Sequence, residues 1–186
     1  MNILQVHSED LLGSVFNGYR LQKSLNKRGI LSKQIVQEKK GFDDKVVELK
    51  PFVYAEDCLR RLEGKLFVNN MFSLWGRQLF ESKEFQESDI IHYHMIHHNL
   101  ISTTELMLMA DAKPSVWTIH DPWAVTGHCV HPLGCNGWKN GCRSCPYPDY
   151  WFPASQKTAE QMWGINHMNY SRLKADTRTR AFTCCR

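Results

Sequence analysis

His120 and Asp121 stand side by side at the end of a short apolar run at positions 116–119. Histidine titrates near neutral pH, so it can act as a general base or as a hydrogen-bond donor. Adjacent residues of an extended chain point to opposite sides, so the two side chains need not bond to each other. We predict that His120 and Asp121 are the catalytic residues. The alternative is that one of them lines a cleft while the other anchors a loop.

Four more histidines lie close together upstream: His92, His94, His97 and His98. Alternation along a strand places His92 and His94 on one face, whereas the later pair falls in the loop that follows. The sequence has no HExxH motif and these histidines have no carboxylate partner, which argues against a metal site. We predict that His94 and His97 bind substrate by hydrogen bonding in a cleft. The alternative is that they are polar residues at the edge of a sheet.

A glycine-containing turn at Gly13 and Ser14 follows the first apolar run and precedes a helical pattern. The free N–H groups and the dipole at the start of a helix can receive a phosphate or a sugar hydroxyl. The sequence contains neither a GxGxxG nor a Walker motif, which argues against a dinucleotide-binding protein and a P-loop enzyme. We predict that Gly13 and Ser14 bind substrate; the alternative is a glycine that only permits the turn.

Four of the seven cysteines share one segment with the spacing C-x5-C-x6-C-x2-C: Cys129, Cys135, Cys142 and Cys145. Four thiolates can close a tetrahedral shell around zinc and clamp a long segment that lacks a core. We predict a structural zinc ion on these residues, with His128 or His131 as a substitute for one thiolate. The alternative is reduced cysteines that pack as small apolar side chains or pair in occasional disulfides. Cys58 is isolated, and we expect it to be buried in a helix.

The segments that must position these residues alternate between strands and helices. Residues 1–36 give a strand, a turn, a helix and a strand, a βαβ unit that implies parallel strands. Further strands are predicted at 45–49, 89–94 and 114–120, and helices at 54–82, 99–110 and 154–174. The sequence therefore predicts an α/β fold: a Rossmann-like open parallel sheet with helices on both faces and a long Cys-rich loop at 121–153. Ligands of such sheets bind beyond the carboxyl ends of the strands.

Composition supports a soluble domain. The chain has 186 residues, 42% of them hydrophobic, and a net charge of +4 without a long basic run, so nucleic acid is not an expected partner. No apolar run is long enough to span a membrane, and the first residues lack the features of a secretory signal. We therefore expect a cytoplasmic protein whose thiols stay reduced.

Several motifs resemble one family. The segments NILQV at 2–6, DIIHYH at 89–94, WTIHDPW at 117–123, TGHC at 126–129 and GCRSCP at 141–146 are similar to the N-terminal domain of family 4 glycosyltransferases of the GT-B fold. The likeness is to the bacterial colanic-acid or exopolysaccharide type and covers residues 1–174 as an acceptor-side domain. It implies retaining transfer from a nucleotide-sugar donor to a saccharide or lipid-linked acceptor, without a metal or other cofactor in the chemical step. It also places Gly13 and Ser14 near the donor phosphates and His120 near the transferred sugar.

One departure from this family shapes the expectation most. The family pattern continues into a second, donor-binding domain, which is absent from these 186 residues, so we expect the chain to be inactive alone. Residues 175–186 are expected to be an irregular tail, truncated or frame-shifted. A lipid-linked acceptor would bring the protein to the inner face of the membrane as a peripheral partner. The alternative function is a zinc-stabilised binding module that recognises protein or nucleic acid through the Cys- and Trp-rich loop.

Overall fold

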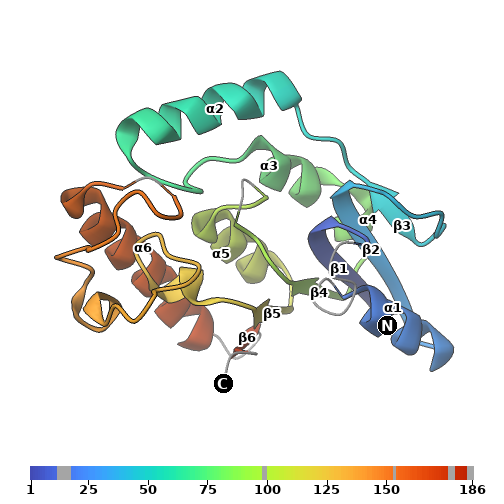
Figure 1. Ribbon diagram of the computed structural model, residues 1–186. Helices are drawn as coiled ribbons and strands as arrows, with labels where there is room; N and C mark the ends of the chain where they lie inside the picture. The colour runs from blue at the N-terminus through green and yellow to red at the C-terminus, as the bar shows by residue number, and fades with distance from the viewer. Residues whose placement is uncertain (12–17, 98–99, 153, 176–178, 184–186) are drawn as a thin grey trace.

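Six parallel strands form one open sheet in the order β3-β2-β1-β4-β5-β6 (Figure 1). The computed structural model describes residues 1–11, 18–97, 100–152, 154–175 and 179–183. The strands are β1 (Asn2–Glu9), β2 (Leu31–Glu38), β3 (Val46–Glu48), β4 (Ile90–Tyr93), β5 (Ser115–Ile119) and β6 (Thr179–Thr183). This confirms the predicted α/β class with a parallel, Rossmann-like sheet.

Local sequence signals mark the ends of several helices. They are α1 (Tyr19–Lys27), α2 (Val53–Leu66), α3 (Leu74–Glu81), α4 (Lys83–Gln86), α5 (Thr103–Ala112) and α6 (Gln156–Ala175), with 3-10 turns η1 (Pro122–Val125) and η2 (Gly137–Asn140). A capping box of Ser102 and Glu105 starts α5, and the Ser73 hydroxyl accepts a hydrogen bond from the backbone N–H of Gly76 at the start of α3. Gly29, at φ 77°, follows the end of α1, as glycine commonly does after a helix.

The two faces of the sheet differ in polarity. Leu4, Tyr93 and Trp117 lie on one face and are buried in a single apolar core with residues of α3, α4 and α5. The other face carries Gln5 and, opposite it in register, His92. Alternation along parallel strands produces this division, since successive side chains point to opposite faces. Because α1 lies against the polar face, helices cover both faces of the sheet, as predicted.

Helix α2 packs through its acidic side. Glu56 and Glu63 are its buried side chains. Glu56 Oε1 accepts hydrogen bonds from the backbone N–H groups of Leu74 and Trp75, both at 2.8 Å, and so caps α3. Burial raises the pKa of Glu63, which accepts three backbone N–H groups between residues 70 and 72. Cys58 is therefore exposed, and the prediction that it is buried was wrong, because the carboxylates of α2 face inward and its apolar stripe faces out.

The tail differs in part from its prediction. Residues 179–183, expected to be irregular, form β6, which pairs with β5 over five residues. The sequence alone did not reveal this strand, because so short a strand carries little hydrophobic alternation and is ordered by pairing with its neighbour. None of the described helices is long and apolar enough to cross a membrane.

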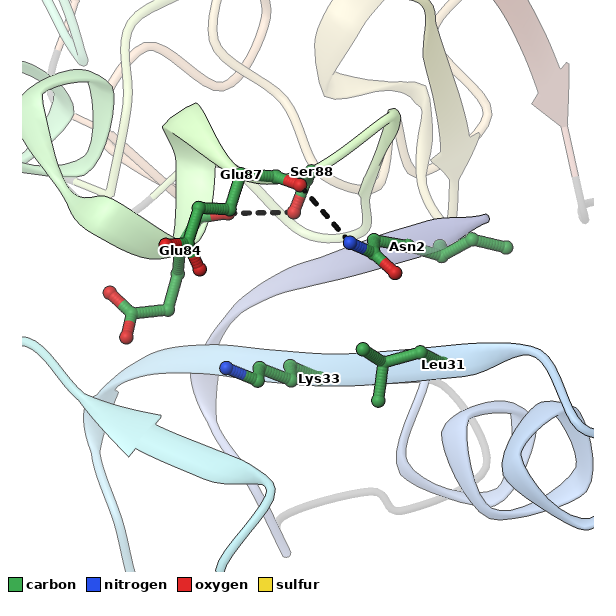
Figure 2. Close-up of a pocket in the computed structure, with 7 residues that line it drawn as sticks. Asn2, Leu31, Lys33, Glu84, Glu87 and Ser88 are labelled. Atoms are coloured by element: carbon green, nitrogen blue, oxygen red, sulfur yellow. Dashed lines mark hydrogen bonds between the residues drawn. The ribbon is translucent and has the colours of Figure 1, made fainter.

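A small cavity lies at the amino ends of the strands (Figure 2). Asn2, Leu31 and Lys33 contribute to its wall, and the Asn2 side chain donates a 3.3 Å hydrogen bond to the carbonyl of Glu87. Its volume of about 40 Å³ holds only a few water molecules. This end of the sheet is opposite to the one at which parallel sheets bind ligands.

Candidate functional site

Three strands bring histidines to the carboxyl edge of the sheet. His7 comes from β1, His94 directly follows β4, and His120 directly follows β5. The ring centres of His7 and His94 are 6.2 Å apart, and those of His94 and His120 are 5.6 Å apart. The strand order reverses beside β1, and open α/β sheets bind ligands at such a switch point. We call His7, His94, His97 and His120 the histidine edge.

His94 occupies the centre of the histidine edge and is buried. Its Nε2 lies 2.8 Å from Gln5 Oε1, and its Nδ1 lies 3.3 Å from His120 Nε2. The indole N–H of Trp117 donates to the His94 carbonyl at 3.0 Å, which fixes the backbone as it leaves β4. His94 thus stands behind the half-buried His120. Direct binding of substrate by His94 stays a prediction.

Asp121 points away from His120 and toward another histidine. Its Oδ2 lies 2.6 Å from Nε2 of the buried His97. Its Oδ1 accepts a 2.9 Å hydrogen bond from the backbone N–H of Trp123, at the start of η1. Asp121 and His97 therefore tie the loop after β4 to the loop after β5. Catalytic roles for Asp121 and His120, and substrate binding by His97, stay predictions.

Burial keeps two of the sheet histidines neutral. It lowers the pKa of His7 and of His92 to about 4, and the nearby His120 acts in the same direction. His7 Nδ1 lies 3.2 Å from the backbone nitrogen of Glu9 and 3.1 Å from its carbonyl oxygen. His92 Nε2 lies 2.8 Å from the hydroxyl of Thr118. Both rings are uncharged at neutral pH, so they lend the site polarity but no charge.

Gly18 packs directly against the centre of the histidine edge. A Cβ atom at this position would lie 2.4 Å from His94 Nε2 and 2.8 Å from Gln5 Oε1, and φ is 83°. Only glycine satisfies both the close approach and the left-handed backbone. Gly13, Ser14 and His98, which the sequence singled out, lie outside the described residues.

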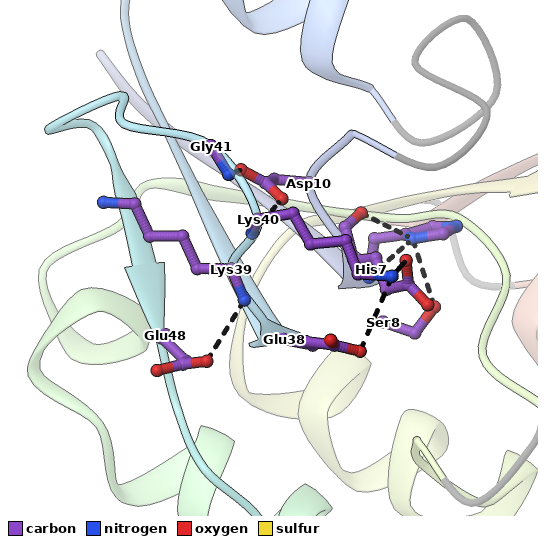
Figure 3. A network of polar contacts seen from close by, with 9 residues as sticks. His7, Ser8, Asp10, Glu38, Lys39, Lys40, Gly41 and Glu48 are labelled. Carbon is purple, nitrogen blue, oxygen red and sulfur yellow. Dashed lines mark hydrogen bonds and ion pairs between the residues drawn. The ribbon is translucent and has the colours of Figure 1, made fainter.

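A polar network holds the loops that leave β1 and β2 (Figure 3). The buried carboxylate of Asp10 accepts 2.8 Å hydrogen bonds from the backbone N–H groups of Lys40 and Gly41. The Lys40 ammonium lies 2.7 Å from Glu9, a contact that raises the pKa of Lys40. The network fixes the backbone at Asp10, which precedes Gly13 and Ser14 in the sequence.

Sequence reasoning assigned no role in this site to four residues: Gln5, His7, Gly18 and His92. One signal was available for three of them, because strict alternation places Gln5 and His7 on one face of β1 and His92 on the matching face of β4. Gly18 gave no such signal, since its role depends on contacts with residues far away in the sequence.

The four clustered cysteines gather around one small cavity. We call residues 126–152 the cysteine loop. Cys129, Cys135, Cys142 and Cys145 line its cavity of about 20 Å³ together with His128. His128 Nε2 lies 3.1 Å from Cys145 Sγ, and the backbone N–H of Gly137 donates to Cys135 Sγ at 3.3 Å. Burial, aided by the neighbouring thiols, raises the pKa of Cys129 to about 12.

The same residues do not form a metal centre as they are placed. Among the described residues, no group of three or more His, Cys, Asp or Glu side chains is arranged to hold a metal ion. His131, named as a substitute ligand, is exposed and does not line the cavity. The geometry brings the predicted ligands together but gives the predicted zinc no support.

One similar protein is described as "Putative colanic acid biosynthesis glycosyl transferase WcaC" from Escherichia coli (strain K12). It is 34% identical to this chain over an alignment of 80 residues, and the match covers 39% of this chain and 20% of the relative. The chain thus matches about a fifth of that protein's length. No protein-family model and no solved structure matches the chain. Part of the chain is therefore related to a glycosyltransferase.

Proposed function

We propose that this chain is the acceptor-side, N-terminal domain of a retaining GT-B glycosyltransferase that acts in polysaccharide biosynthesis. The observation that carries the proposal is the convergence of His94 and His120 at the carboxyl edge of a parallel sheet, beside the reversal of strand order. Partial similarity to a colanic acid glycosyl transferase supports the same assignment. Residues 1–174 make up the proposed domain.

In this proposal His120 touches the sugar. It is the most exposed member of the chain of contacts that runs from Gln5 through His94, and a neutral imidazole can exchange hydrogen bonds with sugar hydroxyls. Asp121 and His97 hold the two loops at a fixed spacing. Gly13 and Ser14 would approach the donor phosphates. No metal or other cofactor takes part in the proposed chemical step.

Donor binding in a GT-B enzyme involves a second domain. We therefore expect the 186-residue chain to bind an acceptor saccharide but not to turn over a nucleotide sugar. The test is calorimetric titration of the full chain with oligosaccharides released from colanic acid, alongside turnover assays with UDP-glucose, UDP-galactose, GDP-mannose and GDP-fucose. We expect binding that His120→Ala reduces about tenfold, the equivalent of one hydrogen bond.

His131→Ala is the matched control, since His131 is an exposed histidine of the cysteine loop, and we expect it to bind like the unmodified chain. Robust turnover by the chain alone would contradict its proposed inactivity. Equal loss of binding in both variants, or no binding at all, would contradict the proposed site. Nucleic-acid binding that persists near physiological salt would favour the binding module instead.

We further propose that the protein is cytoplasmic and reaches the membrane through α2. The outward side of this helix carries exposed apolar residues at four-residue spacing: Tyr54, Cys58, Leu62 and Leu66. Arg61 and Lys65 flank this stripe and form no ion pair with any described residue. Glu56 and Glu63 are buried, and an exposed apolar stripe flanked by basic side chains suits the surface of an anionic bilayer. Such a position would suit a lipid-linked acceptor.

Co-sedimentation with vesicles tests the role of α2. We expect the chain to bind vesicles that contain phosphatidylglycerol more strongly than neutral ones. The Leu62→Gln/Leu66→Gln variant should lose most of this binding, whereas Met168→Gln, an exposed apolar residue of α6, should keep it. Equal binding by both variants would contradict a role for α2.

A further inference from the structure

The geometry of His94 and His120 is that of an in-plane hydrogen bond and not of a ring stack. The two ring planes differ by 20°, the ring centres are 5.6 Å apart, and the facing nitrogens are 3.3 Å apart. The distance between centres exceeds the distance between nitrogens by about twice the radius of an imidazole ring. Both nitrogens therefore lie close to the line that joins the ring centres, where an N–H of one ring points at the lone pair of the other.

Gln5 sets the direction of this bond. Its Oε1 can only accept a hydrogen bond, so Nε2 of His94 must carry a proton where the two atoms lie 2.8 Å apart. A neutral His94 then has an unprotonated Nδ1, which accepts from His120 Nε2. In neutral His120 the remaining nitrogen, Nδ1, is consequently the unprotonated one.

The surroundings protect the first bond of this chain from water. Gln5 is fully buried and His94 is 4% exposed. Gly18 covers the Gln5–His94 contact so closely that a Cβ atom would displace it. The Trp117 indole holds the His94 backbone in place. A buried hydrogen bond with no competing solvent imposes its donor and acceptor pattern more strongly than an exposed one.

We infer that Gln5 is a positioning residue. It selects the tautomer of His120 indirectly, because Gln5 bonds to His94 and His94 bonds to His120. The inference deepens the proposed function and rests on it in one respect: an unprotonated Nδ1 of His120, which is buried in the chain without ligand, would accept a hydrogen bond from a sugar hydroxyl that displaces the groups covering it. The tautomer itself is a property of the chain without any ligand.

Long-range ¹H–¹⁵N spectra of the full chain, labelled on its histidines, test the inference. At a pH where the rings are neutral, we expect His120 and His94 in the Nε2–H form. In Gln5→Glu, a carboxylate beside His94 favours its imidazolium, whose Nδ1–H then donates to His120 and moves His120 to the Nδ1–H form. In Gln5→Leu, a proton on His94 Nε2 has lost its acceptor, so the proton moves to Nδ1 with the same result for His120.

Gln22→Glu is the matched control, because Gln22 is also a buried glutamine but has no bond to either histidine among the contacts described. It should leave the His120 tautomer unchanged. If the unmodified chain shows His120 as Nδ1–H, or if both Gln5 variants keep the Nε2–H form, the inference is overturned. Gln5→Leu provides an answer even where the buried charge of Gln5→Glu prevents folding.

Saccharide titration separates this inference from the proposed function. With both correct, Gln5→Leu should weaken oligosaccharide binding about tenfold, the equivalent of one hydrogen bond. A tautomer switch without any saccharide binding by the unmodified chain overturns the proposed function and leaves the positioning role intact. Saccharide binding with no tautomer switch overturns the positioning role alone.

Discussion

The histidine edge and the cysteine loop both collect residues that could do chemistry, yet they are organised differently. At the histidine edge, side chains from three strands meet at bonding distance, as in the chain from Gln5 to His94 to His120. In the cysteine loop, four thiols and His128 share a cavity but are not arranged to hold a metal. Adjacent parallel strands fix both the position and the direction of the side chains at their ends. Turns bring side chains near one another without fixing where they point.

The largest effect is expected at Gly18. Gly18→Ala should lower the free energy of unfolding by about 3 kcal/mol or more, since the new Cβ displaces the Gln5–His94 contact and the backbone is left-handed. Gly29→Ala is the matched control, with φ 77° but nothing within 4 Å of its Cβ, and should cost only about 1 kcal/mol. Urea unfolding measures both. Equal losses would mean that the histidine edge is not tightly packed.

The next largest expected effect is a loss of folding stability at acidic pH. His7 and His92 have a folded pKa of about 4, below the ordinary value of 6.5, so the unfolded chain binds more protons between these pH values. Stability is therefore fully present above pH 6.5 and is lost as the pH falls toward 4, by at most about 3 kcal/mol for each histidine.

Urea unfolding at several pH values follows this loss. His7→Gln and His92→Gln should each reduce the slope of the free energy of unfolding against pH between pH 6.5 and 4. His131→Gln changes an exposed histidine of the cysteine loop and should leave the slope as it is. An unaltered slope in the first two variants would show that these rings are not held neutral by burial.

A smaller effect is expected in the cysteine loop. Cys142 is 9% exposed and packs with Ala154 and Ala159, so Cys142→Ser should cost about 1–2 kcal/mol by placing a hydroxyl in an apolar cluster. Cys58→Ser, at an exposed position of α2, should be close to neutral. Zinc analysis of the same samples also tests the cysteine loop. One zinc ion per chain that is lost in Cys142→Ser would support the predicted structural zinc site.

Thiol reactivity gives the finest distinction. Iodoacetamide at pH 7.5, followed by peptide mapping, should label the exposed Cys58 before Cys129, whose pKa burial raises to about 12. Labelling in 6 M urea should remove the difference. Equal rates in the folded chain would contradict the buried placement of Cys129.

Sequence patterns were sufficient for the strands and helices that obey simple periodicities. The βαβ unit at residues 1–36 and the strand that leads to His120 were predictable, because apolar alternation and glycine positions carry that information locally. The positions of His94 and His120 at one edge followed from the parallel sheet alone.

What could not be predicted depends on contacts between distant parts of the chain. Gln5 and His94 are 89 residues apart in the sequence, and neither segment alone indicates that their side chains bond. The inward Glu56 and Glu63 of α2, which left Cys58 exposed, likewise serve backbone groups beyond the helix itself. The sequence spacing of the four cysteines indicated that they lie near one another, but it could not predict the directions of their sulfur atoms.

The most direct test of the account is to titrate the chain, labelled on its histidines, with oligosaccharides released from colanic acid and to follow each ring by NMR. The account predicts that the signals of His120 and His94 shift, whereas those of His128 and His131 in the cysteine loop do not. Shifts confined to His128 and His131 would contradict it and would make the cysteine loop the binding site.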